Sequence, residues 1–124
     1  MGLTLCVLPD ERGTIVRIGG DIDICVAETL EECLLRIMRS HTAQLLLDLS
    51  AVTFFDCTGI RALLLTRRRA ELRSGSADLI EASAAVRRVI DLTGLRDVFP
   101  IHDGGERAMA NVNDDTWTSR AQAR

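Results

Sequence analysis

One stretch decides the fold of this chain: Asp48-Leu49-Ser50-Ala51-Val52-Thr53-Phe54-Phe55-Asp56-Cys57-Thr58-Gly59-Ile60. It begins inside a short apolar run, residues 44–49, whose consecutive leucines are typical of a strand buried on both faces. It ends where apolar residues start to recur at helical spacing, over residues 59–73. The residues between, 50–56, predict a linker that delivers Asp56 and Thr58 to the start of that helix. In open α/β sheets, this edge is where function usually lies.

Strand and helix patterns alternate on both sides of that stretch. Residues 3–8 and 14–18 predict a hairpin that Gly19 and Gly20 end. An amphipathic helix is expected over residues 25–39, with acids early and arginines late, as the helix dipole favours. The C-terminal part predicts a strand at 77–81, a helix at 84–92, a strand at 98–101 and, after a capping box at Asp103 and Glu106, a helix at 104–112.

The order of these elements predicts one α/β domain. Strands that alternate with helices imply right-handed crossovers and a mostly parallel sheet, to which the hairpin adds an antiparallel edge. We therefore expect a mixed sheet of about five strands with four helices packed against it, over residues 1–112. Residues 113–124 are polar and are expected to form a flexible tail.

The composition excludes several classes of function. The chain has 124 residues and a net charge of −3, and all 15 of its basic residues are arginine. Without lysine it has neither the phosphate-binding lysine of a P-loop or kinase nor the amine of a Schiff-base enzyme. The mild acidity also argues against nucleic acid as a partner, because binding its backbone requires a clustered basic face.

The cysteines and histidines predict no metal site and no cofactor. The four cysteines lie far apart, and only two histidines, His41 and His102, could join them. Cys6, Cys25 and Cys33 are interpreted as small buried hydrophobic residues. No signal segment or bilayer-spanning apolar run is present, so we expect a cytoplasmic protein with reduced thiols and no membrane partner.

The residues alone leave the role of the central stretch open. The simplest interpretation is that Asp56 or Thr58 only caps the helix. A receiver domain would need a lysine, and nucleophilic catalysis by Thr58 would need a base, whereas His41 and His102 both lie elsewhere in the predicted order. The chain is therefore not predicted to be an enzyme.

Three segments, in order, resemble one known family. The stretch from Asp48 to Ile60 is similar to the signature of STAS domains, in particular of anti-sigma factor antagonists, approximately D-L-S-x-V-x-F-[ILMF]-D-[SC]-[ST]-G-[IL]. Residues 20–23, Gly-Asp-Ile-Asp, resemble the turn before the family's first helix. Residues 85–95 resemble its late helix and the Gly-Leu exit. The resemblance covers about residues 3–110.

The resemblance implies a regulatory binding protein. In this family the antagonist binds an anti-sigma factor that has GHKL-type serine/threonine kinase activity, and this frees a sigma factor. The partner binds ATP and Mg²⁺ and phosphorylates the position that corresponds to Thr58, which removes its affinity for the antagonist, and a phosphatase reverses the change. The implied partner-binding residues are Asp21, Ile22, Asp23, Asp56, Cys57, Thr58, Gly59, Ile60 and Arg61.

Two alternatives remain open at this stage. Some STAS proteins are adaptor subunits of signalling or lipid-transport complexes and are not phosphorylated. In addition, Cys57 stands where serine is frequent in the family, and a thiol at a helix N-terminus can be reactive, although a compact half-buried filler is the simpler interpretation.

Overall fold

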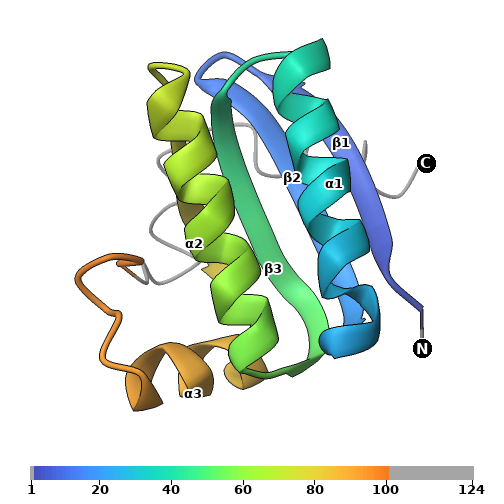
Figure 1. Cartoon of the computed structure of the whole chain (residues 1–124), viewed down its shortest axis with the longest axis vertical. Coiled ribbons are helices and arrows are strands. Elements are labelled where there is room, and N and C mark those ends of the chain that lie inside the picture. The colour runs from blue at the N-terminus through green and yellow to red at the C-terminus, as the bar shows by residue number, and fades with distance from the viewer. Residues whose placement is uncertain (1, 101–124) are drawn as a thin grey trace.

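A computed structural model describes residues 2–100 as four strands and three helices (Figure 1). The α/β class is confirmed. Within the described residues the sheet has four strands where about five were predicted for the whole chain, and the three helices predicted in this range are all present. In chain order the elements are β1 (Thr4–Asp10), β2 (Gly13–Ile22), α1 (Ile24–Ser40), β3 (Gln44–Phe55), α2 (Cys57–Leu72), β4 (Ser76–Ala82) and α3 (Ala84–Leu92).

The sheet has the order β1-β2-β3-β4, which is also the order of the sequence. β1 pairs with β2 antiparallel, and the pairs β2–β3 and β3–β4 are parallel, as the crossover helices require. Figure 1 shows α1 and α2 side by side across one face of the sheet, with α3 at its lower end. Both crossovers therefore run over the same face.

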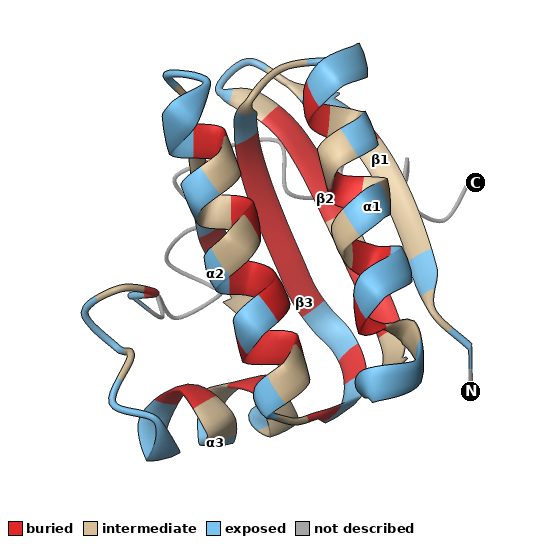
Figure 2. Cartoon of the chain, in the orientation of Figure 1, coloured by how far each residue is buried: buried red, intermediate tan, exposed pale blue. Residues whose placement is uncertain are grey.

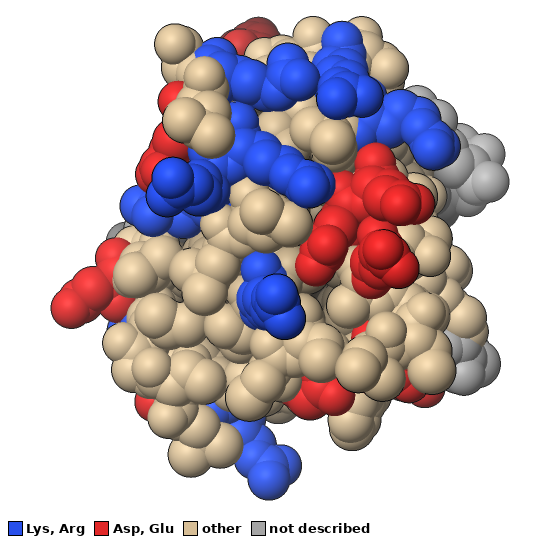
Figure 3. Space-filling view, viewed as in Figure 1, with Lys and Arg blue, Asp and Glu red and all other residues tan. Residues whose placement is uncertain are grey.

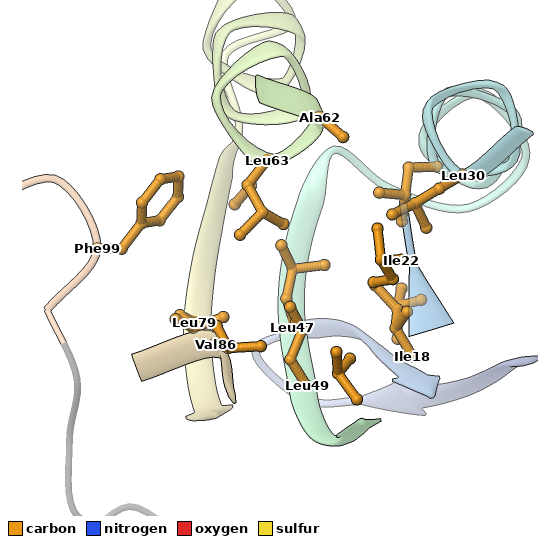
Figure 4. Close-up of a cluster of buried hydrophobic side chains, with 14 of the residues drawn as sticks. Ile18, Ile22, Leu30, Leu47, Leu49, Ala62, Leu63, Leu79, Val86 and Phe99 are labelled. Carbon is orange, nitrogen blue, oxygen red and sulfur yellow. The ribbon is translucent and has the colours of Figure 1, made fainter. Parts of the chain in front are cut away.

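The core lies between the sheet and these helices. Five consecutive residues of β3, from Leu45 to Leu49, are buried, as expected of a strand covered on both faces (Figure 2). Leu47 and Leu49 point into the main core (Figure 4), to which Leu45 also belongs, whereas Leu46 belongs to a smaller cluster. α1 buries one stripe at helical spacing, which consists of Ala27, Leu30, Leu34 and Met38.

Strands β2 and β3 run further than the side-chain pattern predicts. The expected linker at 50–56 is strand through Phe55, and β2 continues past Gly20 to Ile22. The reason is backbone pairing, because Ile22 still pairs with Phe55 where the apolar pattern has lapsed. Gly20 permits a register shift at that point, since its φ of 95° is open mainly to glycine.

The prediction of a strand at 98–101 is wrong for residues 98–100, the part that the structure describes. The backbone amides of Val98 and Phe99 both donate to the carbonyl of Leu95, at 3.1 and 2.9 Å, and so form a turn. Phe99 is nevertheless 1% exposed and joins the main core. Burying one aromatic ring needs no sheet pairing, so its apolar character alone misled the prediction. The helix predicted at 104–112 and the tail at 113–124 lie outside the described residues.

Candidate functional site

Two helix N-termini lie side by side at one edge of the sheet. Strands β2 and β3 are parallel neighbours and end in register, with Ile22 paired to Phe55. The next residue of each strand, Asp23 or Asp56, is an N-cap, and a helix follows at once. The two segments that sequence analysis singled out are therefore brought together at this edge.

Asp56 holds both the first turn of α2 and the hydroxyl of Thr58. Its Oδ1 accepts from the backbone N–H of Thr58 at 3.0 Å and from Thr58 Oγ1 at 2.5 Å. Asp23 caps α1 in the same manner, accepting from Cys25 N at 3.0 Å. Of the two capping candidates at α2, Asp56 is the cap and Thr58 lies in the first turn, half-buried, with an oriented hydroxyl.

A steric contact explains why glycine stands at position 59 of the motif. A Cβ atom at Gly59 would lie 2.4 Å from Cε1 of Phe55, far inside van der Waals contact. The last residue of β3 therefore packs its ring directly against the first turn of α2. Because Phe55 is itself only 6% exposed, the ring has no free space into which to move. This contact fixes the place of Thr58 relative to the sheet.

A hydrogen bond joins the ends of β2 and β3. Thr53 Oγ1 donates to Oδ1 of Asp21 at 2.5 Å. This bond to the charged form lowers the pKa of Asp21 below its usual value. Thr53 was not singled out from the sequence, because only the register of the two strands shows that the residues are neighbours.

The predicted site residues divide into exposed and buried groups. Cys57 and Arg61 are exposed, and the four carboxyl and hydroxyl residues are half-buried, namely Asp21, Asp23, Asp56 and Thr58. Ile22 is 0% exposed, Ile60 is 5% exposed, and Gly59 is buried as well. These three residues pack inside the fold and support the edge. Another molecule can therefore reach only part of the residues that the sequence motif contains.

Two hollows flank this edge. A groove of about 590 Å³ lies between α1 and α2, and a second hollow of about 440 Å³ lies between the end of β3 and α3. Ile24 beside the groove is 76% exposed, and Phe54 and Leu92 beside the second hollow are 48% and 77% exposed. Exposed apolar side chains grouped in this way are typical of interaction sites.

Sequence analysis missed Ile24 and Phe54. Ile24 stands three residues before the buried Ala27, so its spacing is that of a core residue. Phe54 could have been recognised from strand alternation, because Phe55 is buried and its neighbour must face the other way.

All four thiols are free, and their burial differs from the prediction. Cys25 and Cys57 are exposed, at the first turns of α1 and α2, whereas Cys6 and Cys33 are partly buried. The interpretations of Cys25 as a buried residue and of Cys57 as a half-buried filler are wrong, since both lie in first turns of helices just beyond the ends of β2 and β3. Within residues 2–100, no three His, Cys, Asp or Glu residues form a group that could hold a metal ion. No helix in this range has the length and apolar character needed to cross a membrane.

Comparison with known proteins identifies the class of the protein. The profile of the STAS domain family matches residues 7–108, which is most of the chain, and the protein belongs to this family.

Its relatives narrow the class. The chain is 26% identical over 91 residues to an anti-sigma-B factor antagonist of Staphylococcus epidermidis, covering 73% of this chain and 84% of that protein. It is 24% identical over 106 residues to the Staphylococcus aureus anti-sigma-B factor antagonist, covering 86% and 98%. Among solved structures, an anti-sigma factor antagonist from Mycobacterium paratuberculosis is 28% identical with a TM-score of 0.74, covering 89% of this chain and 94% of that one. The fold also matches the phosphorylated form of the Bacillus cell fate determinant SpoIIAA, with a TM-score of 0.63 at 19% identity and coverage of 90% and 99%.

Proposed function

We propose that the chain is an anti-sigma factor antagonist, a cytoplasmic binding protein rather than an enzyme. It binds an anti-sigma factor with GHKL-type serine/threonine kinase activity, which releases a sigma factor, and phosphorylation of Thr58 ends the binding. The observation that carries the proposal is the hydroxyl of Thr58, held by Asp56 at a helix N-terminus and flanked by exposed apolar side chains. The names of the relatives support the same function.

The fold can tolerate a phosphate on Thr58. A helix N-terminus favours an anion, because the helix dipole places partial positive charge there. The carbonyl of Asp56 still accepts from the amides of Gly59 and Ile60, at 3.0 and 3.2 Å, and the contact between Gly59 and Phe55 does not involve the hydroxyl. The first turn of α2 therefore has supports that phosphorylation leaves intact.

The local electrostatics nevertheless change sharply. The Thr58 hydroxyl donates its hydrogen to Asp56, and a phosphate ester has no such hydrogen to give. Phosphorylation also adds about −1.5 to −2 charge beside that carboxylate. The apolar side chains next to Thr58 would have to bury this charge against a partner, at a cost that unmodified threonine does not incur. Phosphorylation is therefore expected to remove partner affinity.

The partner supplies the remaining chemistry. The chain has no lysine with which to hold ATP phosphates, so ATP and Mg²⁺ bind to the kinase, and a phosphatase restores the hydroxyl. Asp56 orients the Thr58 hydroxyl toward its own carboxylate and is placed to take the proton as the phosphoryl group is transferred.

The test is to purify the protein from its host together with its partners, add ATP, and map any phosphoryl group by peptide mass spectrometry. We expect one phosphoryl group on Thr58, its retention as phosphoserine in Thr58→Ser, and its loss in Thr58→Val. Thr29→Val, on the exposed surface of α1, is the matched control and should be modified normally. Thr58→Glu should fail to bind the anti-sigma factor. A stable complex with transport ATPase subunits and without phosphate would contradict the switch and identify an adaptor.

A further inference from the structure

The groove between α1 and α2 has walls of opposite charge. Glu28 and Glu31 line it from α1, and Arg61 and Arg68 line it from α2. Figure 3 shows the acidic cluster over α1 next to arginines over α2 on the same face of the molecule. Among the described residues no ion pair crosses this groove. The ion pair formed on α2 joins Arg67 to Glu71, within the same helix. The charges of the two walls are thus left for another molecule.

The two walls are also level with each other. Strands β2 and β3 end in register, and each helix starts one residue later. Glu28 is the fifth residue of α1 and Arg61 is the fifth residue of α2, so the two stand at the same height along the groove. Ile24, Ala27, Leu64 and Leu65 supply apolar lining between them.

We propose that this face binds a second copy of the chain, with a two-fold axis that runs along the groove. Such an axis places α1 of one copy over α2 of the other. Glu28 then faces Arg61 of the partner subunit, and the contact is made twice, as an isologous interface requires. An axis across the groove would instead place α2 of one copy over α2 of the other, so that arginines would meet arginines, which electrostatics disfavours.

The signs match less well further along the helices. The last turns of α1 carry Arg36 and Arg39, and the same axis brings Arg36 level with Arg68 and Arg69 of α2, so arginines meet there. The single acid of α2, Glu71, already pairs with Arg67 of its own helix. The complementarity is therefore strongest at the half of the groove that holds Glu28 and Arg61.

The size of the face predicts a weak dimer. Helices of 17 and 16 residues are each about 25 Å long, and two of them side by side cover on the order of 500 Å² per copy. A stable interface usually buries about 800 Å² per partner. We therefore expect a reversible dimer that raised salt dissociates. Because Thr58 and Arg61 line the same groove, the dimer covers part of the surface proposed for the anti-sigma factor and competes with it.

Sedimentation equilibrium of the purified full chain at low salt tests this proposal, using Glu28→Arg and Arg61→Glu. Each variant alone places like charges at both contacts between residues 28 and 61, and its association constant should fall at least tenfold. An equimolar mixture of the two should regain dimerisation, because arginine then meets glutamate at both contacts. Circular dichroism checks that each variant is folded.

Two control variants separate position from net charge. Glu11→Arg, in the turn before β2, and Arg88→Glu, on α3, make the same charge changes outside the groove and should dimerise like the wild type. The proposal is overturned if the wild type stays monomeric up to millimolar concentration at low salt. It is equally overturned if folded single variants still dimerise, or if their mixture does not. All these measurements use the chain alone, so failure here leaves the proposed anti-sigma partner untouched.

Discussion

Asp56 combines a structural and a chemical role in one carboxylate. It satisfies the N–H of Thr58 and the hydroxyl of Thr58 with the same oxygen, whereas Asp23 satisfies only an N–H at α1. Removing Asp56 therefore takes away a cap and the group that orients the Thr58 hydroxyl, and removing Asp23 takes away a cap alone.

We predict that Asp56→Ala lowers the free energy of unfolding by about 1 kcal/mol, the usual value of an N-cap. Asp56→Asn should stay within a few tenths of a kcal/mol of the wild type, since asparagine caps nearly as well. Urea unfolding measures both, with Asp23→Ala as the matched cap variant. If Asp56→Asn is as unstable as Asp56→Ala, the charge and not the cap is what matters at this position.

The second prediction concerns Gly59. Gly59→Ala should destabilise the protein by roughly 1–3 kcal/mol, as overpacking does, despite the better helix propensity of alanine. The cause is the ring of Phe55, which lies 2.4 Å from the added carbon. Gly2→Ala is the control, because nothing lies within 4 Å of a Cβ there.

A double variant tests that cause. Phe55→Leu in the Gly59→Ala background should recover part of the loss, and a double-mutant cycle in urea gives the coupling. Simple additivity of the two substitutions would show that the clash is elsewhere.

At the scale of elements, the matched ends of β2 and β3 determine where both helices start. The bond from Thr53 to Asp21 joins the two strands just before their last pair, Ile22 with Phe55. It joins Asp21, one of the proposed partner-binding residues, to the segment that leads into α2.

We therefore predict a pH dependence that Thr53→Val removes. The hydrogen bond lowers the pKa of Asp21 in the folded protein, so the stabilisation is fully present above the ordinary aspartate pKa of about 3.9. It is lost as the pH falls through the lowered folded value. Carbon-13 NMR titration of the Asp21 carboxyl group should give a higher pKa in Thr53→Val than in the wild type. Equal pKa values would show that the bond does not form in solution.

The elements also show what a single sequence can and cannot predict. Five buried residues in succession made the first half of β3 predictable, and the place of Asp56 and Thr58 before an apolar helix predicted that both would lie at a helix start. The second half of β3 was not predictable, because its strand conformation comes from backbone pairing with β2 and not from its side chains. Phe99 shows the converse, since it is buried without any pairing. The exposure of Ile24 depends on how far α1 extends past the sheet, which no local pattern records.

At the scale of the whole molecule, the proposed partner-binding surface occupies one edge of the sheet. The two exposed thiols lie at that edge, since Cys25 and Cys57 are in the first turns of α1 and α2. Cys6 lies in β1 and Cys33 in the middle of α1, both partly covered. The reactivity of the four thiols should therefore distinguish the exposed helix starts from the partly covered part of the fold.

We predict that a thiol reagent modifies Cys25 and Cys57 rapidly and Cys6 and Cys33 slowly, because reaction at a covered thiol requires local opening of the fold. In urea above the unfolding transition all four should react at similar rates. Peptide mass spectrometry at timed intervals identifies each site. With Cys25→Ser as background, the fast reaction is confined to Cys57, and a bulky adduct there should weaken anti-sigma factor binding without unfolding the protein. Four equal rates in the native protein would contradict the burial of Cys6 and Cys33, whereas full partner binding after modification of Cys57 would place the docking surface away from the start of α2.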